Sequence, residues 1–166
     1  MDASASRDQP PGLPPYTYVP GGPWPHPNRD RVDVRHDAID EPALFRRGVE
    51  LFDAGYYWEA HEAWEVLWHA AGRRGPKADV LRGLIKLAAA GIKVRERREA
   101  GVRTHARRAA ECFASARREG DTHPFGLDLD EWIERALSMA ESPPTDPGPP
   151  DAPVTRVFSF RIGRPL

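Results

Sequence analysis

The amino-acid sequence predicts a single all-α domain: a bundle of about five helices with extended, proline-rich termini. Between about residues 41 and 141, apolar residues recur at the three- and four-residue spacing of helices. The 18 prolines are concentrated toward the two ends of the chain, where they prevent long helices. A length of 166 residues with 40% apolar content is sufficient for one domain with its own core.

The prolines also predict the domain boundaries. The segment YTYVPGGPWPHPNRD, which starts at residue 16, has aromatic side chains to bury, so we expect this N-terminal arm to dock on the bundle. The segment VTRVFSFRI near the other end is β-prone and follows a proline-rich stretch. The expected division is a disordered N-terminus over 1–15, a helical domain with its docked arm over 16–141, and a proline-rich tail over 142–166 that ends in a short extended segment.

Five helices follow from the periodicity and from residues that start or stop helices. Asp40 is expected to cap the first helix and Asp128, which has capping-box spacing, the last. Gly55 and Gly72 are expected to end the first two helices, and Gly101 to separate the third from the fourth. The expected ranges are about 41–54, 57–71, 78–98, 103–119 and 128–141.

Composition excludes several classes of protein. The formal net charge of -1 predicts no strong attraction to nucleic acid or to a membrane surface. The longest apolar stretch, about residues 84–92, is interrupted by Lys86 and is too short to span a bilayer. The first sixteen residues lack the apolar core of a signal peptide, and the single Cys112 fits a reducing compartment. We therefore expect a cytoplasmic protein without membrane or nucleic-acid partners; the sequence leaves a homo-oligomer open.

Exposed positions of the third and fourth predicted helices are mostly basic. An anionic ligand such as phosphate or RNA could bind there, but no aromatic residues interleave with the arginines to stack on bases. The interpretation that we favour for these positions is a solvated face.

The second predicted helix carries the one chemically distinctive pattern. At 100° per residue, four ionisable side chains share an arc of about 100° with Trp58, flanked by Trp64 and Trp68. The four are His61, Glu62, Glu65 and His69. Carboxylates beside imidazoles can bind a divalent cation or shuttle protons, and His61/Glu65 and Glu65/His69 are each four residues apart.

A solvated helix face would show similar Glu/His spacing without any site. The three tryptophans between residues 58 and 68 argue against full solvation. If the face is buried, its carboxylates must be paired, protonated or metal-bound.

The segment LFDAGYYWEAHEAWEVLW, followed after a short loop by LRGLIKLAAAGIKV, resembles the domain-of-unknown-function 309 family, often labelled a predicted metal-dependent hydrolase. The resemblance covers about residues 16–115 and implies an all-helical fold with a polar cluster from the first motif. The motif positions are Phe52, Gly55, Tyr57, Glu59, His61, Glu62, Trp64, Glu65 and Trp68.

Two hypotheses from different classes follow. The first is a metal-dependent hydrolase that binds a divalent metal, with ligands Glu59, His61, Glu62 and Glu65, catalytic carboxylates Glu62 and Glu65, and binding residues Trp58, Trp64, Trp68, Lys86 and Lys93. The second is a non-enzymatic helical scaffold or interaction module in which the same residues form a structural polar network. Family members often carry glutamine and histidine where this chain has Lys86 and Lys93. Lysine is a poor ligand and repels a divalent ion, which favours the second hypothesis.

Overall fold

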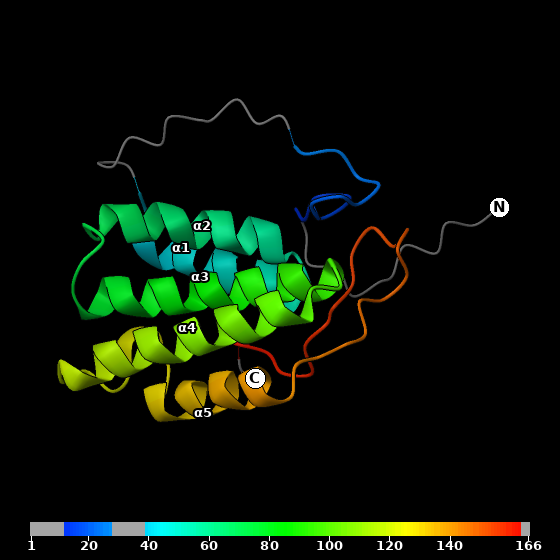
Figure 1. Cartoon of the computed structure of the whole chain (residues 1–166). Coiled ribbons are helices and arrows are strands. Elements are labelled where there is room, and N and C mark those ends of the chain that lie inside the picture. The colour runs from blue at the N-terminus through cyan, green and yellow to red at the C-terminus, as the bar shows by residue number, and fades with distance from the viewer. Residues whose placement is uncertain (1–11, 28–38, 164–166) are drawn as a thin grey trace.

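The computed structural model describes residues 12–27 and 39–163 (Figure 1). It confirms the all-α prediction, since the described residues contain helices and no β-strand. Each α-helix packs mainly against its neighbours in sequence, and short turns join them at alternate ends of the bundle (Figure 1). The elements are α1 (Glu41–Asp53), α2 (Tyr57–Ala70), α3 (Pro76–Arg95), α4 (Glu99–Arg118), the short 3-10 helix η2 (Pro124–Gly126) and α5 (Leu129–Glu141).

The predicted N-terminal caps of α1 and α5 are confirmed. The Asp40 side chain accepts a hydrogen bond from the Ala43 N–H. The Asp128 side chain accepts from the N–H groups of Asp130 and Glu131. These carboxylates satisfy donors that have no partner within the helix and lie at its positive end.

The predicted boundary between α3 and α4 is wrong. Gly101 lies in the first turn of α4, and α3 instead ends at Arg95. There the Arg98 N–H donates to the Lys93 carbonyl and the Arg97 N–H to that of Val94. This is the Schellman pattern, which also ends α1 at Gly55 and α2 at Gly72. The left-handed residue of this pattern at the end of α3 is Arg97, with φ 59°, so no glycine marks the end of the helix in the sequence.

Three helical glycines make room for aromatic rings at the helix crossings. A Cβ atom on Gly48 of α1 would lie 2.2 Å from Nε1 of Trp64 on α2. A Cβ on Gly91 would lie 2.7 Å from the Tyr57 ring, and one on Gly83 2.5 Å from that of Phe113. Because the glycines lack this atom, the helices approach closely over the rings, and all three rings are buried in the core.

The arm and the tail meet at the end of the bundle where α2 begins (Figure 1). The Thr17 N–H donates to the Pro153 carbonyl, which joins the two segments directly. The tail then crosses α1 and α2: the Val157 N–H donates to the Tyr57 hydroxyl, and the N–H groups of Ile162 and Gly163 donate to Asp53. Burial raises the pKa of Asp53, although those two N–H groups favour the charged carboxylate. The tail thus docks in extended form without pairing as a strand.

We expect Gly48→Ala to lower the free energy of unfolding by about 1–3 kcal/mol, because the new methyl group overlaps the Trp64 indole. Urea denaturation measures the change. The matched control is Gly101→Ala, where the added Cβ would meet only the flexible Lys93 side chain at 3.0 Å. That variant should be unchanged or slightly more stable, because alanine favours the helix by up to about 1 kcal/mol. Equal effects of the two substitutions would contradict the close-packing interpretation.

Candidate functional site

The predicted polar residues of α2 point in different directions. Glu59 is only 4% exposed and lies under the N-terminal arm. His61, Glu62 and Glu65 are partly buried, and His69 is exposed. The structure therefore separates Glu59 from the rest of the predicted metal-binding set.

Glu59 binds the arm. Its Oε2 accepts a hydrogen bond of 2.6 Å from the Thr17 hydroxyl, and its Oε1 accepts one of 3.2 Å from the Tyr18 N–H. Thr17 is itself buried. A buried carboxylate is tolerated when its oxygens are hydrogen-bonded in this way. The sequence does not indicate Thr17 and Tyr18, since nothing in the local pattern links a threonine to a carboxylate 42 residues away.

Aromatic rings extend this contact along the first turn of α2. The Trp58 ring lies 4.7 Å from the Tyr18 ring and 5.7 Å from His26, measured between centroids. Its other neighbour is the His61 ring, at 6.2 Å. The arm thus packs Tyr18 and His26 against Trp58 in the first turn of α2. The polar residues Asn28, Arg29 and Asp30, which follow in the arm, lie outside the described residues.

His61, Glu65 and His69 form a ladder on the outer face of α2. His61 Nδ1 is 3.7 Å from Glu65 Oε2, and His69 Nε2 is 4.0 Å from Glu65 Oε1. The Glu65 side chain is 46% exposed, so water screens these contacts and each contributes little to stability. The i,i+4 spacing places these groups together, but on a largely solvated surface.

The two partly buried histidines near this face are shifted toward the neutral form. Burial lowers the pKa of His61, and the Lys86 charge adds to this, whereas Glu65 and Glu62 oppose it. Burial lowers the pKa of His105, on α4, to about 4, with Lys86, Lys93, Arg108 and His61 acting in the same direction. His105 therefore stands as a neutral imidazole amid positive charge.

The predicted binding residues occupy different environments. Trp64 is fully buried against α1 and belongs to the core. Trp68 is partly buried, and the Arg73 guanidinium lies 5.9 Å from its ring centroid. Lys93 forms a 2.7 Å ion pair with Glu96. Lys86 lowers the pKa of His105 more than Lys93 does, and it also lowers the pKa of His61.

A divalent metal does not fit the side chains as they are placed. Across residues 12–27 and 39–163, no group of three or more His, Cys, Asp or Glu side chains is arranged to hold a metal ion. Both Glu59 oxygens are engaged by the arm. At His61 the Lys86 charge opposes a second cation, although the Glu65 and Glu62 carboxylates have the larger effects there.

A family model described as a domain of unknown function, DUF309, matches residues 45–105. This chain contains a DUF309 domain. The match runs from α1 through α2 and α3 to His105 in α4, so it includes every predicted site residue. The arm, α5 and the tail lie outside it. Searches among curated proteins and among solved structures gave no significant match. In the described part of the chain, no helix has the length and apolar character needed to cross a membrane.

The low pKa of His105 predicts a pH dependence of folding. In the unfolded chain an imidazole has a pKa near 6.5, whereas in the folded protein that of His105 is about 4. The unfolded state therefore binds more protons between these values, and the free energy of unfolding should fall as pH drops from about 6.5 toward 4.

His105→Gln should make this fall smaller than in the wild type, as measured by urea denaturation between neutral pH and pH about 5. The ring signals of His105 in an NMR titration should have their midpoint near 4. A midpoint at or above the ordinary histidine value would show that burial and the surrounding cations do not control this group.

Proposed function

We propose that this DUF309 protein is a non-enzymatic helical scaffold or interaction module, and that its α2 polar residues hold the N-terminal arm on the bundle. One observation carries the proposal: the buried Glu59 accepts hydrogen bonds from Thr17 and Tyr18 of the arm. The carboxylate of the motif most protected from water thus has a structural partner.

The placement of the other motif residues supports the same interpretation. The Trp64 ring packs closely over Gly48 of α1, and Trp58 packs on Tyr18 of the arm. Glu65, whose side chain is 46% exposed, lies 3.7 and 4.0 Å from two histidines. Each residue therefore has a packing or surface role that requires no substrate. The alternative, a metal-dependent hydrolase built on His61, Glu62 and Glu65, needs these groups to rearrange around an ion.

Removing the arm's hydroxyl tests the anchoring role of Glu59. Thr17→Val keeps the side-chain shape but leaves Glu59 Oε2 without this donor in a buried site. We expect it to lower the free energy of unfolding by about 1–3 kcal/mol, as measured by urea denaturation. Thr104→Val is the matched control, because Thr104 is exposed and its hydroxyl donates only to the Ala100 carbonyl. An equally small effect of both substitutions would remove the basis of the proposal.

Metal addition distinguishes the two functional classes. A ligand that binds only the folded state raises its stability with the logarithm of ligand concentration above the dissociation constant. We expect neither Zn²⁺ nor Mn²⁺ to raise the melting temperature of protein purified without a histidine tag. Glu65→Gln should change the free energy of unfolding by less than about 0.5 kcal/mol, because the Glu65 side chain is 46% exposed and its contacts with the two histidines are long.

The hydrolase alternative predicts the opposite pattern. Either ion would then raise the melting temperature, and Glu65→Gln would abolish the rise, since it removes the ligand's charge but keeps its shape. That combination would overturn the scaffold proposal.

A further inference from the structure

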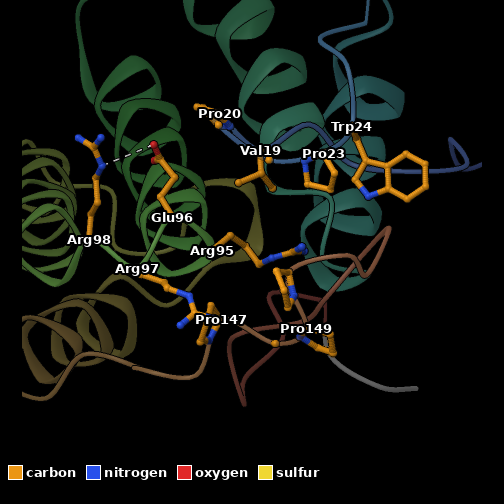
Figure 2. A pocket seen from close by; sticks show the side chains of 14 residues that line it. Val19, Pro20, Pro23, Trp24, Arg95, Glu96, Arg97, Arg98, Pro147 and Pro149 are labelled. Atoms are coloured by element: carbon orange, nitrogen blue, oxygen red, sulfur yellow. Dashed lines mark ion pairs between the residues drawn. The ribbon is translucent and has the colours of Figure 1, made fainter.

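A pocket lies where the arm, the α3–α4 turn and the tail meet, away from the α2 ladder (Figure 2). Its walls are residues 19–24 of the arm, residues 95–98 of the turn and residues 147–150 of the tail. Its volume is ≈ 350 Å³, within the range of pockets that bind small molecules. None of its walls belongs to α2, so it is a separate feature from the predicted motif site.

Three tight backbone turns form the walls. In the arm, the Gly22 N–H donates to the Val19 carbonyl, and Gly21 has φ 74°. Pro20 and Gly21 occupy the two central positions of this turn, as in a type II turn. In the tail, the Gly148 N–H donates to the Asp146 side chain. The third turn is the Schellman end of α3 at Arg97. Hydrogen-bonded turns of this kind give the pocket a preformed shape.

The charge on the walls is positive. Three arginines line the pocket, at positions 95, 97 and 98, against one carboxylate, Glu96. That carboxylate is paired with Lys93 at 2.7 Å and lies 3.9 Å from Arg98 Nε, the contact drawn as a dashed line in Figure 2. Within the described residues, no carboxylate forms an ion pair with Arg95 or Arg97. The uncompensated charge of the pocket therefore sits on these two guanidinium groups.

Arg95 is the more unusual of the two. Its Nη2 donates to the Ala152 carbonyl at 3.2 Å, whereas its Nη1 is buried and has no hydrogen-bond partner among the described residues. Burial lowers the pKa of Arg95, although a guanidinium of this kind stays charged. Because Nη1 is covered, Arg95 acts on a ligand in the pocket chiefly through the positive charge of its guanidinium.

The remaining walls are apolar. Val19, Pro20 and Pro23 come from the arm and Pro149 from the tail, and Trp24 lines the pocket beside them. The Trp24 indole is stacked on Tyr16 at 5.2 Å, which fixes its position. The pocket thus combines a cationic side with an apolar side.

We propose that this pocket binds a small organic anion, whose carboxylate or phosphate contacts Arg95 and Arg97 and whose apolar or aromatic body lies against the proline and tryptophan wall. The cationic side supplies charge-assisted hydrogen bonds, bidentate where the geometry permits. The apolar side selects against inorganic anions, since burial of the ligand body contributes free energy that a bare ion lacks.

The site is separate from the proposed scaffold role, since neither Glu59 nor Thr17 lines it. The arm that Glu59 holds does form one wall of the pocket. The two failures are distinguished by their readouts, which are stability for the scaffold role and ligand-induced amide shifts for the pocket.

Amide NMR titration of the full chain tests the site with four probes: phenyl phosphate, benzoate, inorganic phosphate and phenol. We expect phenyl phosphate or benzoate to give saturable shifts centred on the amides of Gly21, Gly22, Arg97 and Gly148. Inorganic phosphate and phenol, which each lack half of the required chemistry, should bind at least roughly tenfold more weakly. The stronger of the two aromatic anions identifies the headgroup.

Arg97→Gly removes the accessible charge without disturbing the turn, because glycine favours the left-handed backbone that Arg97 adopts. It should weaken binding of the better aromatic anion by roughly tenfold. Arg73→Gly is the matched control, because Arg73 is also exposed and left-handed, with φ 63°, but lies in the α2–α3 turn. It should bind the probe as the wild type does.

Three outcomes would overturn the proposal. The first is the absence of saturable shifts with both aromatic anions at millimolar concentration. The second is equal affinity of the wild type and Arg97→Gly. The third is a set of shifts centred on the exposed Arg107 and Arg108 of α4 instead of the pocket, which would indicate non-specific binding to a basic helix face.

Discussion

The packing of this bundle depends on aromatic rings seated over helical glycines. Gly48 on α1 admits Trp64 of α2, and Gly91 on α3 admits Tyr57 from the other end of α2. Two rings on one helix are thus held by two neighbouring helices, which fixes the rotation of α2 about its axis. That rotation decides the direction of every other side chain on the helix. It places Glu59 under the arm, whereas the Glu65 side chain remains partly exposed to solvent.

The same packing lets the bundle hold its extended ends. Extended segments must satisfy their backbone N–H and carbonyl groups elsewhere when they are covered. Residues 45–105, which match the family model, supply several of these partners. Glu59 and Asp53 accept hydrogen bonds from N–H groups of the arm and the tail, and Arg95 donates to a tail carbonyl. Segments outside the family match therefore complete a surface that the domain alone would leave open, including the pocket at the α3–α4 turn.

Burial and charge together determine what the motif residues can do. Glu59 is tolerated inside because neutral donors of the arm replace water. His61 and His105 are shifted toward neutrality by burial and by the nearby Lys86. The α2 face thus combines the Glu62 and Glu65 carboxylates with the opposing charge of Lys86, whereas the arginines of the α3–α4 turn line a separate pocket.

The sequence by itself determined the local features: the five α-helices of the described residues, the caps at Asp40 and Asp128, the stops at Gly55 and Gly72, and the residues that make up the α2 motif. These depend on residues within one turn of each other, where spacing is decisive. The tertiary structure alone decided which side of α2 is buried, because that depends on glycines in other helices. It also decided that Thr17 would be the partner of Glu59 and that α3 would end at a left-handed Arg97, not near Gly101. Contacts between residues distant in sequence form only when the packing brings them together, and no local pattern encodes them.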